Sequence, residues 1–306
     1  MPAQILVIGS SNTDMVVKTT KLPAPGETVI GGTFLMNPGG KGANQAVAAA
    51  RLAGTVTFVA KIGSDIFGQQ AIDGFQREGI DTRHILTDAD HPSGVALINV
   101  DAHGENCITV APGANARLQP ADVDAALQTA LPDTLVLIQL EIPLPTVEYA
   151  IQQATKRGLR VILNPAPAQM LPADLFPNLF LITPNETEAE ILTGIRVTDE
   201  SSAEQAALKL HQMGVANVIV TLGAKGAYLH TETGATVVRA SPVTPVDTTA
   251  AGDCFNGALA VALSEGQTLP EAVTFACRVA SISVTRMGAQ ASMPTRNELK
   301  DKETMA

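Results

Sequence analysis

The residues best suited to chemistry lie at positions 247–257, where Asp247 and Asp253 bracket a run of very small side chains. The apolar run at 255–263 predicts a helix, with Asp253 in its first turn. A helix N-terminus carries partial positive charge and unpaired N–H groups, so it binds anions readily. The residues with the least side chain to cover those N–H groups are Ala250, Ala251 and Gly252.

A carboxylate beside an anion site is repelled by the bound anion. This placement makes sense if Asp253 removes a proton from a group that then attacks the anion. The stretch therefore indicates phosphoryl transfer, with Asp253 as the base and the N–H groups of residues 250–253 as the anion hole. The alternative is an acid that only caps a buried helix.

A second stretch of small residues occupies positions 37–44 and precedes a predicted helix at 45–52. Three glycines in four positions, 39–42, allow the backbone to approach a ligand closely. The stretch is not a Walker P-loop, because no Ser or Thr follows Lys41 and no glycine lies five residues before Gly40. It is either part of a binding site or a plain loop before a tightly packed helix. Lys41 is expected either beside the transferred phosphate or in contact with a lid.

Several polar groups directly follow predicted strands. In open α/β sheets, ligands bind beyond the carboxyl ends of the strands, so these groups should converge at one edge. Taken singly, each is more often a loop residue or a helix cap, and residues 185–188 also form a natural N-terminal cap. Residues 221–226 suit either a loop against a nucleotide or a hairpin turn. The groups that follow strands are Asn12, Asp14, Glu141, Asn164, Asn185 and Gly223.

The elements that would position these groups alternate along the chain and predict a three-layer α/β/α body with a mostly parallel sheet. Stretches rich in β-branched residues at about 14–34 and 93–110 predict a small β-sheet lid. The chain, residues 1–306, is expected to be one domain, with a polar end at 296–306 that frays. Strands are predicted at 4–9, 55–60, 134–140, 160–163, 179–182 and 218–221, and helices at 67–76, 146–156, 186–192 and 203–213.

Composition narrows the class of protein. The net charge of −10 argues against nucleic acid and anionic membranes as partners. The three cysteines, Cys107, Cys254 and Cys277, form no CxxC pair, which suits a reducing cytosol and no zinc site. Residues 1–9 lack the charged segment of a signal peptide, and no apolar run approaches 18 residues. A cytoplasmic protein is predicted.

Residues 39–46 (GGKGANQA) and 247–257, with Asn12-x-Asp14 and Asn185-x-x-Glu188, carry a specific resemblance. Over essentially its whole length the chain resembles the ribokinase/phosphofructokinase-B family of sugar kinases. The resemblance implies a ribokinase-like, Rossmann-like fold whose β-sheet lid is also a homodimer surface. It further implies ATP-dependent phosphorylation of D-ribose at its 5-hydroxyl, with Mg²⁺ accompanying ATP. The ribokinase branch of the family also binds an activating monovalent cation, usually K⁺.

The resemblance assigns roles residue by residue. Glu188 would organise magnesium indirectly. Two departures from related chains are Cys277, where a polar adenine neighbour is common, and Cys254, where Thr or Ala is common. Positions matching the sugar contacts are Asn12, Asp14, Gly40, Lys41, Asn44, Glu141 and Asp253. Positions matching the nucleotide site are Asn185, Thr221, Gly223, Ala224, Lys225, Gly226 and Gly252. Positions matching the monovalent cation site are Asp247, Thr249, Ser283, Arg286, Gly288 and Ser292, largely through backbone carbonyls.

Other functions stay open at this point. A related kinase could act on 2-deoxyribose, fructose or a nucleoside, although 3% aromatic residues and no Trp disfavour a base-stacking pocket. A nucleoside hydrolase would need clustered aspartates near Gly9, which the sequence lacks. A non-catalytic sugar-binding module predicts a lost base or a broken anion loop, yet Asp253 and Gly252 are both present.

Overall fold

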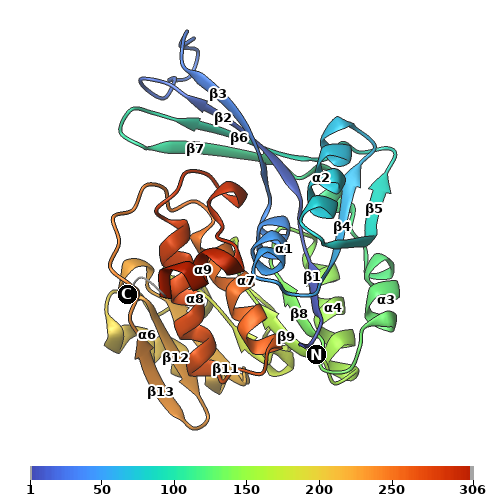
Figure 1. The fold of residues 1–306 in the computed structure, drawn as a ribbon, viewed down its shortest axis with the longest axis vertical. Helices are drawn as coiled ribbons and strands as arrows, with labels where there is room; N and C mark the ends of the chain where they lie inside the picture. The colour runs from blue at the N-terminus through green and yellow to red at the C-terminus, as the bar shows by residue number, and fades with distance from the viewer. Residues whose placement is uncertain (1, 304–306) are drawn as a thin grey trace.

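In a computed structural model, the chain folds around a nine-stranded sheet of order β13-β12-β11-β10-β9-β8-β1-β4-β5 (Figure 1). The structure describes residues 2–303, with side chains as far as Leu299. The sheet is parallel from β11 to β5, and β12 and β13 add an antiparallel hairpin at one edge. Its strands are β1 Ile5–Ile8, β4 Val56–Gly63, β5 Asp81–Asp88, β8 Leu135–Ile138, β9 Arg160–Leu163, β10 Leu181–Ile182, β11 Asn217–Thr221, β12 Ala227–Thr231 and β13 Gly234–Val238.

Helices cover both faces of this sheet, which confirms the predicted three-layer α/β/α architecture. Helices α1, α2, α7 and α8 contribute to the core on one face, and α3, α4, α5 and α6 to the core on the other. The α-helices are α1 Lys41–Arg51, α2 Ile66–Arg77, α3 Pro120–Thr129, α4 Leu144–Lys156, α5 Glu186–Thr193, α6 Glu200–Gln212, α7 Ala251–Ser264, α8 Leu269–Ser283 and α9 Arg296–Glu303, with short 3₁₀ turns at Gly113–Arg117, Ala173–Asn178, Gly223–Lys225 and Gln290–Ser292.

The interior strand β1 shows why helices must cover both faces of the sheet. Its four residues are all buried, and they alternate between the two cores. Ile5 and Val7 belong to the core under α1 and α7, whereas Leu6 and Ile8 belong to the core under α4 and α6. Successive strand residues point to opposite faces, so a continuous apolar strand needs helices on both sides.

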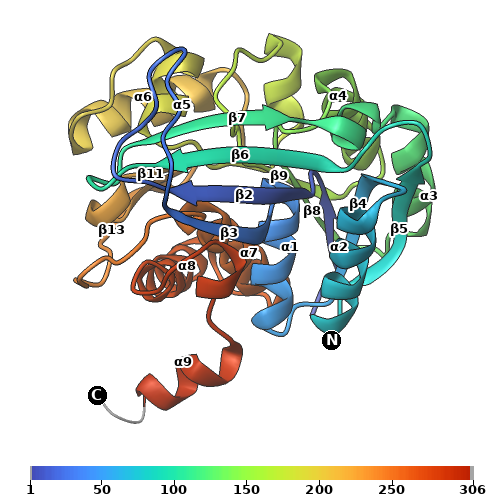
Figure 2. The same cartoon turned by 90° about the horizontal axis from the view of Figure 1, so that it is seen from above.

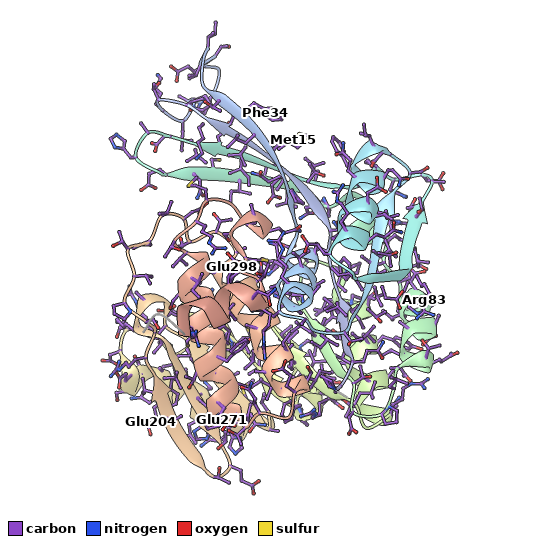
Figure 3. All side chains as sticks on the ribbon, in the orientation of Figure 1. Met15, Phe34, Arg83, Glu204, Glu271 and Glu298 are labelled. Atoms are coloured by element: carbon purple, nitrogen blue, oxygen red, sulfur yellow. The ribbon has the colours of Figure 1, made fainter. Side chains whose placement is uncertain are left out.

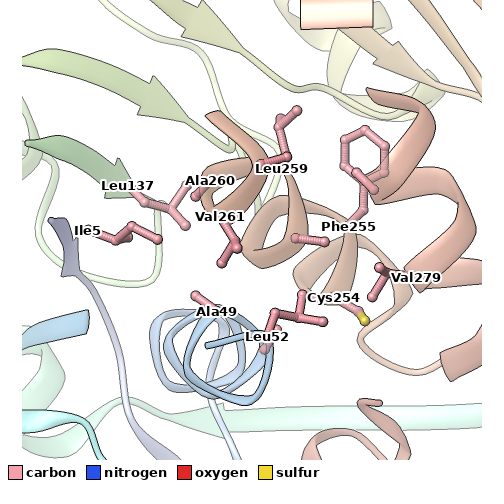
Figure 4. Packing of buried hydrophobic residues seen from close by; sticks show 14 of the residues in the cluster. Ile5, Ala49, Leu52, Leu137, Cys254, Phe255, Leu259, Ala260, Val261 and Val279 are labelled. Carbon is pink, nitrogen blue, oxygen red and sulfur yellow. The ribbon is translucent and has the colours of Figure 1, made fainter. Parts of the chain in front are cut away.

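Helix α7 is packed on all sides, and its N-terminus is therefore held firmly. Every residue from Asp253 to Ser264 is buried, in keeping with a helix that is apolar all round. Ala49 of α1 and Leu52, directly after this helix, lie near Val261 of α7 (Figure 4). The two helices approach so closely that a Cβ added to Gly257 would lie 2.6 Å from the Ala48 Cβ.

A separate four-stranded sheet of order β3-β2-β6-β7, here called the lid, lies across the body at the end where β1 finishes (Figure 2). Its strand β2 pairs with β3 in antiparallel and with β6 in parallel orientation. Met15 and Phe34 mark its position in Figure 3. The lid strands are β2 Asn12–Lys18, β3 Thr33–Gly39, β6 Gly94–Val100 and β7 Asn106–Ala111.

The first half of the lid differs from the prediction. Strand β3 begins where the prediction placed its end, so the residues from 37 to 39 are in a strand rather than a loop. Pro38, which has no N–H to donate, is compatible with this because β3 lies at the edge of the lid and forms hydrogen bonds with only one neighbouring strand. Residues 19–32, rich in Pro and Gly, form the connection instead.

Several element boundaries also required the structure. Helix α1 begins at Lys41 and not at residue 45, because Gly40 turns the chain with a φ of +88° directly before it. Strands β5, β12 and β13 and helices α3 and α8 were not predicted. The end expected to fray is a helix, α9, as far as Glu303, and residues 304–306 lie outside the described chain. No helix in the described part is long and apolar enough to cross a membrane.

Candidate active site

Asp253 is the third residue of α7 and one of the few buried acids, with 6% of its surface exposed. Two amides of α1 hold its carboxylate. Asn44 Nδ2 donates to Oδ2 at 2.9 Å, and Gln45 Nε2 donates to Oδ1 at 2.9 Å. Burial raises the pKa of Asp253, and the nearby Lys41 ammonium and the two amide donors oppose that rise. The carboxylate is therefore fixed in place and more basic than an exposed aspartate.

The N-terminus of α7 is open. Ala250 is its N-cap, with a left-handed φ of +58° and no capping side chain. Among the described residues, the N–H groups of Ala250, Gly252 and Asp253 have no hydrogen-bond partner, whereas that of Ala251 donates to the Thr248 carbonyl at 3.2 Å. No atom lies within 4 Å of where a Cβ on Gly252 would be. Because Asp253 bonds to α1 rather than to its own helix, it does not act as a helix cap.

The predicted sugar residues converge opposite Asp253 from the lid strand β2, from α1 and from the loop after β8. Asn12 starts β2, and its Oδ1 accepts a hydrogen bond from Asn115 Nδ2 at 2.8 Å, which leaves the Asn12 amide nitrogen available. Glu141 is held through one oxygen, Oε2, by Ser10 Oγ at 2.6 Å and by the Lys41 N–H at 2.9 Å. Its other oxygen, Oε1, accepts no hydrogen bond within the described chain.

Asp14 is packed against backbone. A Cβ added to Gly39 would lie 2.2 Å from Asp14 Oδ2, so no other residue fits at that position without displacing the carboxylate. Burial, followed by the charges of Glu141 and Asp253, raises the pKa of Asp14 to about 6, while Lys41 lowers it. Hydroxyl groups that donate to this carboxylate would replace the water that burial removes.

Lys41 lies among these acids. Burial alone would lower its pKa, but the surrounding carboxylates, first Asp253 and then Glu141, raise it above the ordinary 10.5. Glu188 and Asp14 act on it in the same direction. The ammonium is therefore charged and located in the site, which favours the first of the two roles considered for Lys41 over a lid contact.

A cavity of about 610 Å³ opens beside the N-terminus of α7. Lys225 is the member of the predicted nucleotide set that does not line it, because its ammonium donates to the Thr198 carbonyl at 3.2 Å. Cys277, whose role was in doubt, does line it. The predicted residues along its wall are Asn185, Thr221, Gly223, Ala224, Gly226 and Gly252, and the apolar wall not predicted is Pro242, Val243, Pro245, Phe255 and Val284.

Asn185 and Glu188 form a reciprocal cap at the start of α5. Asn185 donates from its backbone N–H to Glu188 Oε2 at 2.9 Å and from its Nδ2 to Oε1 at 3.0 Å. Burial raises the pKa of Glu188 to about 7, although the Asn185 N–H and Lys41 lower it. Each carboxylate oxygen accepts one hydrogen bond from Asn185, which holds the carboxylate in place at the start of α5. Within the described residues, no cluster of three His, Cys, Asp or Glu side chains is placed to hold a metal ion.

The predicted monovalent cation residues are partly assembled. The Asp247 carboxylate accepts the Thr249 N–H at 2.9 Å and the Gly288 N–H at 2.8 Å, so it ties the loop before α7 to the loop after α8. The guanidinium of Arg286 pairs with Glu298 at 2.7 Å. Ser283 and Ser292 lie at the ends of α8 and of the last 3₁₀ turn, with their hydroxyls bonded to the Ala280 and Ala289 carbonyls.

Sequence reasoning missed the residues that support the site from behind. Gln45 was noted only as part of a motif, and its bond to Asp253 was not anticipated. Ser10 and Asn115 orient Glu141 and Asn12. The signal for Ser10 was its place directly after β1, whereas nothing in the local sequence marks Asn115.

A buried carboxylate beside an open helix N-terminus, close to a group of polar side chains and to a cavity of about 610 Å³, is the arrangement expected of a kinase that phosphorylates small hydroxyl compounds. The model of the pfkB family of carbohydrate kinases matches residues 2–296. The chain belongs to this family and is a carbohydrate kinase.

Within this family, the chain is similar to kinases of pentose sugars. The chain is 47% identical to a ribokinase of Haemophilus influenzae over 97% of both chains. It is 39% identical to a deoxyribokinase of Salmonella typhimurium, again over 97% of both. The solved structure of an Arabidopsis thaliana ribokinase complexed with ribose and ATP superposes with a TM-score of 0.91, at 33% identity over 98% of both chains.

Proposed function

We propose that this protein transfers the γ-phosphoryl group of ATP to the 5-hydroxyl of D-ribose, with Asp253 as general base. The observation that carries the proposal is the position of Asp253. It is buried and held by two amides, at the third position of a helix whose N–H groups at Gly252 and Asp253 are open. The similarity to ribokinases, one of them solved with ribose and ATP, supports the choice of substrates.

The chain's own residues account for the chemistry. Asn12, Asp14 and Glu141 would orient the sugar so that its 5-hydroxyl faces Asp253. Asp253 accepts the proton as the oxygen attacks phosphorus, and the bond from phosphorus to the ADP oxygen breaks. The developing charge on the equatorial oxygens meets the N–H groups at Gly252 and Asp253 and the ammonium of Lys41.

Two ions accompany this proposal. Mg²⁺ bound with ATP would neutralise phosphate charge, and it usually keeps waters and phosphate oxygens as ligands. Glu188, held in place by its two hydrogen bonds from Asn185, would act on this metal indirectly. K⁺ would lie beside Asp247, where carbonyl-rich loops meet, and would steady the loop that leads into α7. The cytoplasmic location and the one-domain organisation remain predictions.

The proposal is tested by ADP release with a panel of pentoses, hexoses and nucleosides, each with and without potassium. D-ribose is expected to be the best substrate, and turnover is expected to rise several-fold when K⁺ replaces a large organic cation. A preference for fructose or a nucleoside would overturn the substrate assignment. Equal turnover without K⁺ would remove the cation site but leave the kinase intact.

Gly252→Ala tests the anion site without disturbing the fold. Space is open where its Cβ would be, so the folded chain accepts the methyl group. Alanine in the first turn is expected to stabilise the protein by about 0.4–1 kcal/mol, because it restricts the unfolded chain. The same methyl group would occupy the position of the phosphate, and kcat should fall at least about tenfold because a transition-state contact is lost. Thermal denaturation and steady-state kinetics measure both effects; unchanged kcat would place the phosphate elsewhere.

We also infer that two lids pair in a homodimer. Large apolar side chains are exposed on one face of the lid, where the strand register places Phe34, Met36 and Leu97 together, with 60%, 46% and 51% of their surfaces in contact with solvent. An exposed apolar patch of this kind marks an interaction surface. Sedimentation equilibrium should give twice the chain mass, and Leu97→Lys should give a monomer. A monomeric wild-type protein would contradict the inference.

A further inference from the structure

Gln45 is the most completely bonded side chain behind the base. It is fully buried, with 0% of its surface exposed. Its amide nitrogen donates to Asp253 Oδ1 at 2.9 Å and to Asn164 Oδ1 at 3.0 Å. Its amide oxygen accepts from Gln139 Nε2 at 2.6 Å. Both N–H donors and the carbonyl of this side chain are therefore used.

The orientation of the Gln45 amide follows from a backbone carbonyl. The Thr183 carbonyl can only accept, so it requires the amide nitrogen of Asn164, which lies 3.3 Å away. Asn164 must then present its oxygen to Gln45, and Gln45 must present its nitrogen. The second N–H of that nitrogen is left for Asp253.

Gln139 holds the other end of the same amide. Its nitrogen donates to Gln45, while its own oxygen is buried without a partner in the described structure. That oxygen lies against Gly9, where an added Cβ would be only 2.2 Å away. A buried unpaired oxygen is unfavourable, and the arrangement persists because a flipped Gln139 would set two oxygens against each other.

We propose that Gln45 is a positioning residue for Asp253, and that Asn164 and Gln139 act on the base only through it. This inference rests on the proposed role of Asp253 in phosphoryl transfer. Gln45 and Asn44 each take one acceptor site on a different oxygen of Asp253, which leaves the remaining acceptor sites for the sugar hydroxyl. Gln45 thereby fixes the side-chain rotation of the base and favours its ionised form.

Other charged groups face Asp253 from every neighbouring element. Lys41 of α1 lowers its pKa, and Glu141 after β8 raises it. Asp14 of β2 and Glu188 of α5 carry charges of the same sign as Asp253. These groups stay in place when Gln45 is changed, so a shift in the titration of the base can be assigned to the lost donor.

Gln45→Met keeps the length of the side chain and removes both donors. The expected result is a fall in kcat of about 10- to 100-fold at neutral pH, with KM for ribose within about threefold of wild type. The acid limb of the kcat–pH profile should move up by about one pH unit, because a hydrogen bond to the charged form is lost. Gln4→Met is the matched control. Gln4 directly precedes β1, at the end of the sheet opposite to the site, and its amide donates a hydrogen bond to Thr57. This control variant should leave the profile unchanged.

Asn164→Leu provides the second arm, with Gln45 intact. It should move the acid limb in the same direction by a smaller amount, and it should add no further shift in the double variant Gln45→Met/Asn164→Leu. A wild-type acid limb in either single variant, or additive shifts in the double variant, would overturn the proposal. A wild-type enzyme that does not phosphorylate ribose would instead contradict the proposed function, so the two failures are distinguishable.

Discussion

Asp253→Ala is expected to lower kcat by about 10²–10⁴, the usual contribution of a general base, while KM for ribose changes far less. The hydroxyl that attacks phosphorus must lose its proton, and no other described carboxylate combines hydrogen bonds from α1 with a place on the open end of α7. Steady-state kinetics with ribose and ATP measure the effect. A kcat within threefold of wild type would exclude Asp253 as the base.

The chain offers a control acid at the same helical position. Asp122 is the third residue of α3, where its carboxylate accepts the Gln119 N–H at 2.8 Å and pairs with the ammonium of Lys61 at 2.7 Å. Asp122→Ala should cost about 1–2 kcal/mol of folding free energy, because it removes a cap and an ion pair, and should leave kcat unchanged. The contrast between the two acids separates catalysis from capping.

Stability should respond differently at Asp253. Burial raises the pKa of its carboxyl, so at neutral pH, above the ordinary pKa of 3.8, ionisation of this group opposes folding. Asp253→Ala removes that unfavourable charge, although it leaves the donors of Asn44 and Gln45 unpaired. We therefore expect the stability lost in Asp253→Ala, measured by thermal denaturation, to be smaller at pH 7 than at pH 4, where the wild-type carboxyl is less ionised. A larger loss at pH 7 would show that the ionised carboxylate stabilises the fold.

Ribose should exceed 2-deoxyribose in kcat/KM by a wide margin, up to about 10⁴–10⁵-fold if the 2-hydroxyl meets fully buried partners. Asn12 and Asp14 are the residues expected to bond the 2- and 3-hydroxyls. Without the 2-hydroxyl, a buried polar group in the site would stay unpaired, and this penalty falls on the deoxy sugar alone.

Competition between the two sugars in one assay measures this ratio. Asp14→Ala should reduce it to below about tenfold, because the group that rejects the deoxy sugar is gone. Asp88→Ala is a suitable control, since Asp88 caps the turn at His91 at the end of β5. The similarity to a deoxyribokinase makes the experiment decisive, and comparable efficiencies for the two sugars would reject the assignment.

Much of the body could be predicted because its signals are local. Arg160–Leu163 forms the strand that its β-branched apolar run predicted, and Asp253 lies in the first turn of α7, as its position before an apolar run indicated. Strands β5 and β13, at the two edges of the sheet, and β12 beside β13 were missed because their apolar alternation is weak and they are partly exposed. Residues 296–303 form α9, since Glu298 caps Thr295 and pairs with Arg286.

The candidate site divides in the same way. Residue types and spacing predicted a base, an anion-binding helix end and polar groups at one edge of a sheet. They could not predict that Lys225 turns away to Thr198, because that depends on where α6 begins. Nor could they predict the apolar wall at 242–245, which belongs to a loop without a periodic pattern.

By itself, the sequence determined the kind of chemistry, because an acid next to small residues at a helix start encodes a base beside an anion hole within a few positions. Only the tertiary structure decided how that acid is held. Gln45 reaches Asp253 across 208 positions of chain, and Asn44 across 209, so their contacts exist only once α1 packs on α7. The direction of each amide and the raised pKa of the base follow from burial and from bonds between distant segments, which no local pattern records.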